Sequence, residues 1–393
     1  RWHRLKRMTS PAARHAQSQW SATPVADRKA IMLAFHDLVL ERQVELLDIV
    51  QEETGKSRAD AFNEVIDVAI TARHYAYRAP RLLSPQRAKG ALPLLTSTHV
   101  ERAPKGVVGL IAPWNYPLSL AISDAIPALL AGNAVVLKPD EKTTGTARRA
   151  LALLEEAGLP TGLMQIVEGG AEAGQRVAAA CDYLMFTGST AVGRTLAAQA
   201  GERLIGFSAE LGGKNPLIVL PSADPATAAR GAVGACFSNT GQLCISVERI
   251  YVHESVADAL IAEFAAAAEA LRRGPGWTAD IGRLISEEHL DRVAALVSAA
   301  VAHGARVLTG GTHEGLYYSP TVLVDVPHHA DLHDREVFGP VVYIETVSSV
   351  DEAVTRANDS DYGLNASVWG AVREAREVAS RLEAGTVNIN EGF

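Results

Sequence analysis

The spacing of hydrophobic residues changes along the chain and divides it into a helical first third and a longer α/β remainder. In the first third, apolar residues recur every three or four positions, which is typical of amphipathic helices. Three helices are predicted there: Pro24–Arg42, Val44–Glu53 and Asp60–Arg78. Near Pro93 the pattern changes, and Thr96–Arg102 alternates polar and apolar residues as an exposed strand does.

From Val107 onward, short apolar runs alternate with longer helical stretches. The predicted strands are Val107–Ala112, Ala134–Leu137, Met164–Val167 and Tyr183–Phe186, and the predicted helices are Ser119–Leu130, Thr144–Ala157 and Glu172–Ala180. This alternation indicates a parallel sheet with crossover helices, hence a doubly wound α/β domain. Ligands bind such sheets at the carboxyl ends of the strands. Four polar or glycine-containing turns fall there: Pro113–Asn115, Lys138–Pro139, Gly169–Gly170 and Gly188–Ser189.

A second α/β unit is predicted to begin near Gly212. Its first elements are a strand over Leu217–Leu220, a helix over Pro225–Asn239, a strand over Arg249–Val252 and a helix over Ala257–Arg272. The predicted domains are therefore residues 1–211 and 212–393, with Gly212–Gly213 as the hinge.

Composition narrows the classes of function. The chain has 393 residues, is 48% hydrophobic and 21% charged, and carries a net charge of −8. No basic cluster with interleaved aromatic residues occurs, so a nucleic-acid partner is not expected. The longest apolar run, Leu118–Val136, is interrupted by Asp124, Pro127 and Gly132, so no membrane partner is expected either.

Three cysteines, Cys181, Cys236 and Cys244, are odd in number and lack the spacing of metal ligands. This favours unpaired thiols, a reducing compartment and a cytoplasmic location, with no metal site. The first 26 residues are basic and contain no acid until Asp27, which is compatible with a transit peptide. We favour an ordinary helix-bearing segment, because no apolar core or cleavage pattern is present.

Cys244 closes the stretch Phe237–Cys244, in which Gly241 precedes it and the amides of Asn239 and Gln242 could orient ligands. A cysteine in this setting is either a nucleophile or one more buried thiol, and the motif alone does not decide. For Cys181 and Cys236 the structural interpretation is favoured.

Two polar residues stand at the ends of predicted strands and suit acyl chemistry. Glu210 precedes two glycines and is either a general base or a surface acid. Asn115 lies between Pro113 and Pro117, and its amide is either an oxyanion donor or the cap of the next helix.

Three further features suit a nucleotide, each weakly. Lys138 could meet a ribose hydroxyl or a phosphate, or simply leave the sheet for solvent. Gly188–Gly193, which includes Ser189 and Val192, joins a strand to a helix and could hold a pyrophosphate, although it lacks the usual glycine fingerprint. Glu336 could bind ribose hydroxyls or be a surface acid.

Taken together, these motifs resemble the aldehyde dehydrogenase superfamily. The resemblance runs from Ala13 to Asn390 and rests on PWNYP, LKP, FTGS, ELGGKNP, GQLC, EVFGPVV, YGLNASVW and GTVNIN, in order. It implies the fold of that family, with a dinucleotide-binding domain followed by a catalytic domain. It also implies that Cys244 is the nucleophile, Glu210 the general base, and Asn115 an oxyanion donor together with the backbone N–H of Cys244.

The resemblance further implies NAD or NADP as the cofactor and a small-molecule aldehyde as the substrate. The implied cofactor-binding residues are Trp114, Lys138, Glu141, Gly170, Phe186, Gly188, Ser189, Val192, Leu211, Glu336 and Phe338. Glu141 would repel a 2′-phosphate and favours NAD, whereas Lys142 beside it keeps NADP open.

Within the family, the chain is most similar to an actinobacterial type of succinate-semialdehyde dehydrogenase, which would oxidise succinate semialdehyde to succinate. Where better-known members bind the substrate carboxylate with two arginines, this chain has Ser123 and Ser238. Serines can donate hydrogen bonds but supply no charge. An aliphatic or aromatic aldehyde is therefore an alternative substrate. Two alternatives to the hydrolytic dehydrogenase stay open. One is an enzyme that passes the acyl group to coenzyme A, and the other is a non-catalytic fragment that keeps the fold.

The resemblance also suggests an incomplete chain. It begins at Arg1 and stops at Phe393, whereas the family continues past the segment matched by Asn390. We interpret the chain as truncated at both ends and expect weak assembly or activity. The arm at about residues 89–104 is expected to serve oligomerisation, giving a homodimer or homotetramer when the protein is full length.

Overall fold

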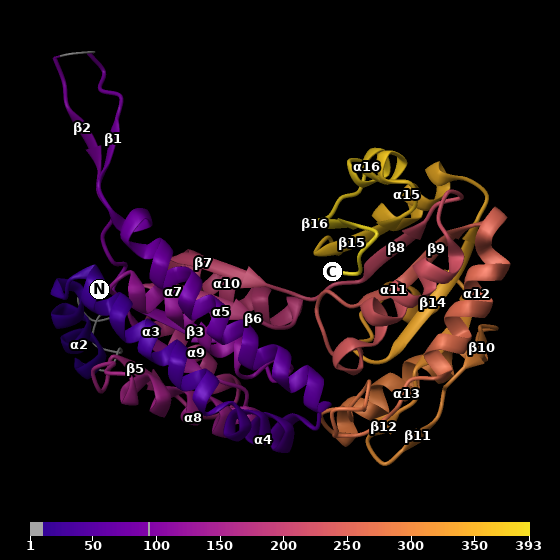
Figure 1. The fold of residues 1–393 in the computed structure, drawn as a ribbon, viewed down its shortest axis with the longest axis horizontal. Helices are drawn as coiled ribbons and strands as arrows, with labels where there is room; N and C mark the ends of the chain where they lie inside the picture. Colours follow the sequence, from indigo (N-terminus) through magenta and orange to yellow (C-terminus); the bar gives the residue numbers. More distant parts are fainter. Residues whose placement is uncertain (1–10, 93–94) are drawn as a thin grey trace. The chain divides into compact units, whose positions relative to one another are not determined.

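The structure, a computed structural model, describes residues 11–92 and 95–393 (Figure 1). It consists of two compact units. The first holds the residues up to Glu53 together with Ala61–Glu210, and the second holds Thr54–Asp60 together with Leu211–Phe393. The sequence analysis did not assign Thr54–Asp60 to the second unit. Backbone hydrogen bonds from Arg283 to Gly55 and from Arg58 to Pro275 place this segment there.

The first unit contains a parallel five-stranded sheet in the order β5-β4-β3-β6-β7. Its strands are β3 (Val107–Ile111), β4 (Ala134–Lys138), β5 (Met164–Ile166), β6 (Tyr183–Thr187) and β7 (Gly206–Glu210). The helices and 3₁₀ turn of this unit are α2 (Pro11–Ala22), α3 (Val25–Glu41), α4 (Gln43–Thr54), α5 (Arg58–Leu83), α6 (Ser119–Ile122), α7 (Ala125–Leu130), η1 (Glu141–Thr143), α8 (Thr144–Glu156), α9 (Ala171–Ala180) and α10 (Thr190–Arg203).

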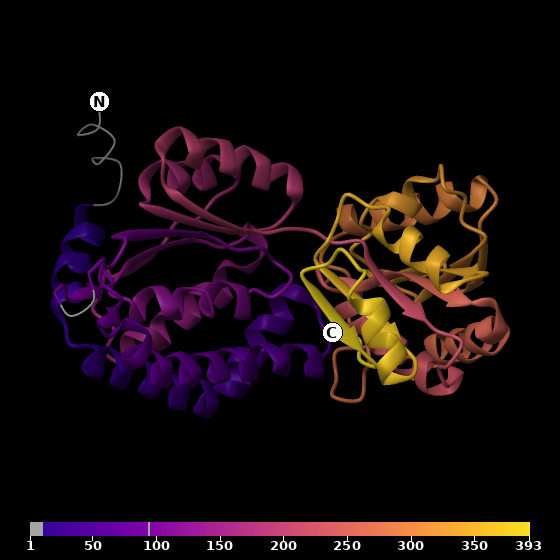
Figure 2. The same ribbon diagram turned by 90° about the horizontal axis from the view of Figure 1, so that it is seen from above.

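Helices cover both faces of this sheet. α9 and α10 pack on one face, and α2, α7 and α8 pack on the other (Figure 2). The chain builds outward from β3 through β4 to β5, then returns to add β6 and β7 on the other side of β3. This reversal is the point at which doubly wound sheets bind ligands.

The predicted helix Ser119–Leu130 is wrong in one respect, because the structure divides it into α6 and α7. The backbone of Ser123 and Asp124 stays in the right-handed helical region. Pro127 has no N–H and cannot donate to the carbonyl of Ser123, so the ladder of hydrogen bonds is interrupted there.

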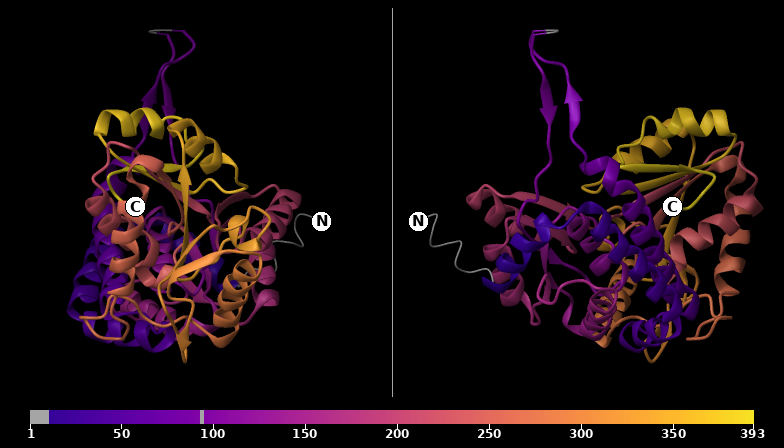
Figure 3. Two further views of the ribbon diagram at one scale, coloured as in Figure 1. Left: turned by 90° about the vertical axis from the view of Figure 1, so that its right-hand side faces the viewer. Right: turned by 60° about the vertical axis from the view of Figure 1, so that its left-hand side comes forward.

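A two-stranded hairpin projects from the first unit (Figures 1 and 3). β1 (Gln86–Ala88) pairs in antiparallel fashion with β2 (Thr98–Val100). The predicted strand Thr96–Arg102 contains β2, whose residues are all exposed. Pro93 and Leu94, within the predicted arm of residues 89–104, lie outside the described residues.

The second unit contains a seven-stranded sheet in the order β10-β13-β14-β9-β8-β15-β16, parallel except for β10. The strands of the unit are β8 (Asn215–Val219), β9 (Val247–His253), β10 (Arg306–Thr309), β11 (His313–Glu314), β12 (Tyr317–Tyr318), β13 (Thr321–Val324), β14 (Val341–Val347), β15 (Asn365–Trp369) and β16 (Thr386–Ile389). Its helices and 3₁₀ turn are α11 (Pro225–Phe237), η2 (Ser238–Gly241), α12 (Glu254–Glu269), α13 (Glu287–Ala302), α14 (Asp331–Asp334), α15 (Val350–Asn358) and α16 (Val372–Ala379).

Alternation along the strands of this sheet produces two buried faces. On β14, Val342 and Ile344 join the cluster under α11 and α12, whereas Tyr343 joins the cluster under α13. Val347, on the same face as Tyr343, packs with α15 and α16. The apolar runs that predicted buried strands therefore supply both faces.

The predicted helix Pro225–Asn239 ends earlier, at Phe237. Asn239 and Thr240 have φ of 50° and 59°, in the left-handed region, so they cannot continue the helix. Among the helices of residues 11–92 and 95–393, none has both the length and the apolar character needed to cross a membrane.

Candidate active site

In the first unit, the predicted site residues gather at the carboxyl edge of the sheet. Asn115 follows β3 and is buried, with 4% of its surface exposed. Lys138 is the last residue of β4 and lies beside Ile111 of β3 in the register of the strands. Glu210, the last residue of β7, is the register partner of Thr187, and its carbonyl accepts a hydrogen bond from the N–H of Gly188 at 3.0 Å.

The turn after β6 leaves little room for a side chain at position 188. A β-carbon built on Gly188 would lie 2.7 Å from the ring of Phe186, which is buried against it. Ser189 is the N-cap residue that precedes α10, and its side chain makes no capping hydrogen bond. The first-turn N–H groups are therefore not taken by that side chain and can receive a phosphate. Val192 is exposed on the same turn.

Glu141 and Gly170 lie next to each other although 29 positions separate them in the sequence. Glu141 is exposed at the start of η1. A β-carbon built on Gly170 would lie 3.1 Å from a carboxylate oxygen of Glu141. The absence of a side chain at position 170 thus leaves space beside this carboxylate, at the N-terminus of α9. Trp114, after β3, is half-buried.

Two acids that were not predicted as site residues, Asp67 and Asp124, interact with each other, and Asp124 also senses the charge of Glu210. Burial, together with the negative charges of Glu210 and Asp67, raises the pKa of Asp124 to about 6. Asp67 comes from α5 and Asp124 immediately precedes α7. The signal in the sequence was that Asp124 is an acid inside the apolar run Leu118–Val136. In the sequence analysis this acid was used only to exclude a membrane span.

Ser123 is directed toward one of these acids. Its hydroxyl donates to Asp67 at 2.8 Å, and the hydroxyl of Ser119 donates to the same carboxylate oxygen. Because a hydroxyl has a single proton to donate, Ser123 cannot donate a second hydrogen bond to a substrate carboxylate in this arrangement.

In the second unit, Cys244 lies on a loop between η2 and β9. Asn215, the first residue of β8, donates from its side-chain amide to the carbonyls of Cys244 and Ser246, at 2.8 Å each. Cys244 is half-buried, whereas Cys181 and Cys236 are each only 1% exposed. Burial raises the pKa of both of those buried thiols.

The loop before Cys244 is held by its own polar residues. The N–H of Gln242 donates to the carbonyl of Asn239, and the amide of Asn239 donates to the carbonyl of Gln242, at 3.0 Å each. The Gln242 side-chain oxygen accepts from Ile285 at 3.0 Å. Both amides are buried, so they support the loop, and their predicted role in orienting ligands remains a prediction.

Gly241 has a positive φ of 67° and the backbone of a second loop against it. A β-carbon there would lie 2.1 Å from the carbonyl oxygen of Gly339. This contact joins the loop of Cys244 to the segment that carries Glu336 and Phe338, which are both candidate cofactor residues.

The Gly212–Gly213 pair is packed rather than open. A β-carbon on Gly212 would lie 2.4 Å from the carboxylate of Glu336, and one on Gly213 would lie 2.6 Å from the carbonyl oxygen of Cys244. The N–H of Gly213 donates to Glu336 at 2.8 Å. The predicted role of these glycines as a hinge stays a prediction, whereas the structure shows close contacts at both positions. Leu211, just before them, is half-buried.

Glu336 has an unusual electrostatic setting. Burial raises its pKa to about 7, the negative charge of Glu248 adds to the rise, and the Gly213 N–H opposes it. Glu248 is buried on β9 and accepts from Lys214 at 2.7 Å and from the backbone N–H of Phe338 at 2.8 Å.

Glu248 and Lys214 were both missed as site-supporting residues. The carboxylate of Glu248 also accepts from the N–H of Val337, so it fixes the backbone of the segment with Glu336 and Phe338. The available signal was a charged residue within an apolar strand, because an acid is rarely fully buried unless it is paired.

Ser238, the second predicted pocket serine, is also engaged internally. Its hydroxyl donates to the carbonyl of Gly234, one turn back in α11, at 2.8 Å. Like Ser123, it has no second proton to donate.

The candidate residues thus divide between the two units. Asn115, Lys138 and Glu210 belong to the first, and Cys244 and Glu336 to the second. The structure brings together the members of each group. That Cys244 faces Glu210 and Asn115 concerns residues of different units and stays a prediction.

Comparison with known proteins identifies the family. Residues 7–393 match the model of the "Aldehyde dehydrogenase family". A Mycolicibacterium smegmatis protein named "Putative succinate-semialdehyde dehydrogenase [NADP(+)]" is 52% identical over 97% of this chain and 75% of its own length. "Benzaldehyde dehydrogenase [NAD(+)]" of Pseudomonas putida is 38% identical over 97% of this chain and 79% of its own length.

A solved structure extends the match to the fold. The crystal structure of an NAD-dependent aldehyde dehydrogenase from Sinorhizobium meliloti superposes with a TM-score of 0.93 at 37% identity, covering 99% of this chain and 79% of that one. The doubly wound sheet, the second α/β unit and the ordered motifs agree with these matches. The chain belongs to the aldehyde dehydrogenase family.

Proposed function

We propose that this protein oxidises an aldehyde to a carboxylic acid with NAD or NADP, using Cys244 as the nucleophile. The observation that carries the proposal is the difference among the three thiols. Cys181 and Cys236 are buried and have raised pKa values, whereas Cys244 is partly exposed on a loop fixed by Asn215. Only the thiolate is an effective nucleophile, and it must reach its substrate.

The residues of the first unit fit a dinucleotide. The turn at Gly188, the first-turn N–H groups of α10 and the Lys138 ammonium are suited to phosphate and ribose groups. In the second unit, Glu336 could accept hydrogen bonds from ribose hydroxyls. When bound, the nicotinamide ring would accept the hydride of the aldehyde carbon.

The chain's own residues supply the remaining chemistry. The Cys244 thiolate would add to the aldehyde carbon, and the amide of Asn115 with the Cys244 N–H would donate to the resulting oxyanion. Loss of hydride leaves a thioester on Cys244. Glu210 would then take a proton from the water that cleaves this thioester and releases the acid. Retention of an acid at Glu210 favours hydrolysis over transfer to coenzyme A.

The nucleophile can be tested with paired variants. Cys244→Ala should abolish the absorbance of the reduced nicotinamide, whereas Cys236→Ala, eight residues earlier, should retain turnover in the fraction that folds. Full activity in Cys244→Ala would remove the basis of the proposal. Cofactor binding by calorimetry without turnover in the unaltered protein would instead favour the non-catalytic alternative.

For the substrate we propose succinate semialdehyde, on the strength of the name of the relative that is 52% identical. A second candidate is an aldehyde without a carboxylate. The hydroxyls of Ser123 and Ser238 both donate within the protein, and Asp67 places a negative charge beside Ser123. The 38% identical benzaldehyde dehydrogenase is compatible with this candidate.

Succinate semialdehyde and butanal form a matched pair, because they share a four-carbon chain and differ in the terminal carboxylate. A kcat/KM at least tenfold higher for succinate semialdehyde would support the first candidate. A preference for butanal or benzaldehyde would support the second.

For the cofactor, two observations point in opposite directions. The relative that is 52% identical is named for NADP(+), whereas the exposed carboxylate of Glu141 beside Gly170 favours NAD. We propose that the protein accepts both and that Glu141 sets the ratio.

We also propose that the protein assembles as a homo-oligomer through the β1–β2 hairpin. The three residues of β2 are exposed, and Leu92, Leu95 and Val100 are exposed apolar residues. Sedimentation of the unaltered protein and of Val100→Glu would test this, since a monomer in both would contradict it.

A further inference from the structure

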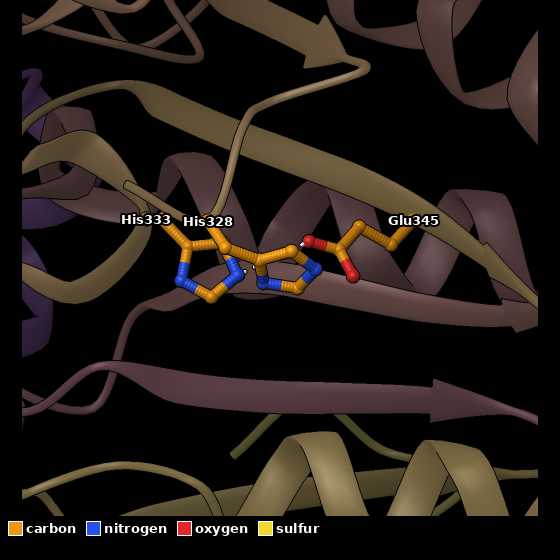
Figure 4. Close-up of side chains that lie close together, drawn as sticks. All are labelled: His328, His333 and Glu345. Carbon is orange, nitrogen blue, oxygen red and sulfur yellow. Dashed lines mark ion pairs between the residues drawn. The ribbon is translucent and has the colours of Figure 1, made fainter. Parts of the chain in front are cut away.

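A cluster of two histidines and one glutamate lies in the second unit, apart from the residues assigned above. His328 and His333 come from the connection between β13 and β14, and Glu345 comes from β14 (Figure 4). One donor atom from each, a ring nitrogen or a carboxylate oxygen, lies within 4.8 Å of the others. We call these three residues the His–Glu cluster.

We propose that the His–Glu cluster binds a divalent transition-metal ion, for which Zn²⁺ is the natural candidate. Two imidazole nitrogens and one carboxylate oxygen are donors that Zn²⁺ commonly takes in proteins, with a water molecule able to complete a tetrahedron.

The first support is the spacing of two donors. Nε2 of His333 and Oε1 of Glu345 lie 3.2 Å apart. Two ligands at about 2.0 to 2.1 Å from a tetrahedral ion are separated by about 3.3 Å, the chord of the tetrahedral angle. The observed separation therefore matches the distance that a shared zinc ion would impose.

The second support is that both atoms lack other partners. Nε2 of His333 and Oε1 of Glu345 are buried and face each other, but they do not reach hydrogen-bond geometry with each other or with another described residue. Their side chains are only 11% and 9% exposed. A buried polar atom without a hydrogen bond is costly, and a metal ion would satisfy both atoms at once.

The third support is an outer layer of partners that holds the donors in place. Nδ1 of His333 lies 2.6 Å from Oδ1 of Asp334, which would fix the proton on Nδ1 and leave Nε2 for a metal. The other carboxylate oxygen of Glu345 accepts from Arg356. Histidine ligands commonly have such a carboxylate behind them, and ligating carboxylates are themselves hydrogen-bonded.

The local charge also suits a divalent cation. Arg356 lies between Glu345 and Glu352, at 2.7 Å from the latter. The carboxylates of Asp334, Glu345 and Glu352 and the guanidinium of Arg356 together carry a net charge of minus two when both histidines are neutral. His328 is exposed and borders a cavity of about 600 Å³ lined also by Glu345 and Arg356, which gives an ion a route of entry.

The competing interpretation places a proton where the metal would be. The close contact with Glu345, with a smaller contribution from the hydrogen bond to Asp334, raises the pKa of His333, which is the direction expected of an imidazole paired with a carboxylate. Metal binding would displace that proton, and the affinity would fall as the pH is lowered. A structural ion pair alone predicts no metal affinity.

Binding can be measured on the full chain carrying Cys244→Ala, so that this thiol does not compete for the ion. After removal of metals with a chelator, Zn²⁺ is titrated against a chromophoric competitor, and Co²⁺ is added to record its visible absorption. We expect one ion per chain, a tetrahedral Co²⁺ spectrum and a Zn²⁺-dependent rise in Tm.

Variants decide whether the cluster is the site. His328→Ala, an exposed change that leaves the ion pair intact, should weaken binding at least 100-fold, and Asp334→Asn should weaken it roughly 10- to 100-fold. His329→Ala, the adjacent exposed histidine, should leave binding unchanged. Unaltered stoichiometry and affinity in His328→Ala would overturn the proposal, as would no Zn²⁺ binding by the parent chain. Either result would leave the ion pair as the role of these residues.

Discussion

The buried pair Lys214–Glu248 should be the most sensitive polar contact of the second unit. The two side chains are 1% and 4% exposed and lie 2.7 Å apart. In Glu248→Gln the counter-charge of Lys214 is lost, and the new NH₂ group faces backbone donors where an acceptor had been. Removing one member of a buried ion pair costs about 3 to 5 kcal/mol.

Because Lys214 can lose its proton, the free-energy cost of burying its unpaired charge has an upper limit. Burial already lowers the pKa of Lys214 in the parent protein, and the negative charge of Glu248 opposes this effect. Without Glu248, the pKa of Lys214 in the folded variant should be lowered further by burial, which favours the neutral amine. Neutralising a lysine of ordinary pKa at pH 7 costs about 4.6 kcal/mol, from 1.36 kcal/mol for each of about 3.4 pH units. The unpaired charge of Lys214 therefore lowers the free energy of unfolding of Glu248→Gln by no more than about 4.6 kcal/mol.

The same reasoning gives the sign of the pH dependence. The unfolded variant protonates Lys214 below about pH 10.4, whereas burial lowers the pKa of Lys214 in the folded variant. The unfolded state thus binds more protons, and the free energy of unfolding rises with pH by up to about 1.36 kcal/mol per unit. The deficit of Glu248→Gln relative to the parent should be largest at pH 7 and smaller at pH 9.5.

Urea denaturation followed by circular dichroism would measure these differences. The control is Lys214→Met combined with Glu248→Gln, which removes the unpaired charge and should be more stable than Glu248→Gln alone. A deficit under about 1 kcal/mol, far below the range for a buried pair, would refute the reasoning. So would a deficit that is the same at both pH values.

Three further predictions address the remaining contacts. Glu141→Gln should raise kcat/KM for NADP relative to NAD about fivefold, since an exposed charge pair is worth about 1 kcal/mol at 4 Å in water. An unchanged ratio would show that Glu141 does not meet the 2′-phosphate. Gly241→Ala should lower the free energy of unfolding by at least about 2 kcal/mol. An alanine with left-handed backbone costs about 1 to 2 kcal/mol, and its β-carbon would lie 2.1 Å from the carbonyl oxygen of Gly339. The control is Gly276→Ala, whose β-carbon would have no atom within 4 Å. Glu336 has a pKa raised to about 7, so between about pH 4.5 and 7 it binds a proton in the folded state that it does not bind in the unfolded state. The free energy of unfolding should therefore fall by up to about 3 kcal/mol as the pH rises through that range. Glu336→Gln should flatten this dependence of stability on pH, whereas an identical slope in the variant would assign the dependence to other groups.

The sequence predicted the alternation of the elements because local patterns decide it. The apolar strand Val107–Ala112 and the helix Thr144–Ala157 bury faces that are visible in the spacing of their own residues. The boundary of Ser119–Leu130 was missed, because one proline that lacks a donor separates α6 from α7 without bending the backbone out of the helical region. Asn239 and Thr240 were missed because left-handed backbone depends on the loop around them.

Of the candidate site, the sequence by itself proposed the residues for the chemistry, Cys244 and Glu210, because they belong to ordered motifs that resemble those of the family; their catalytic roles stay predictions. Only the tertiary structure decided what surrounds them. It directed Ser123 to Asp67, and it placed Glu248 behind the backbone of Phe338. These contacts join residues far apart in the chain. A pattern of local spacing carries no information on which distant carboxylate will meet a buried donor, and that meeting sets the charge and shape of the site.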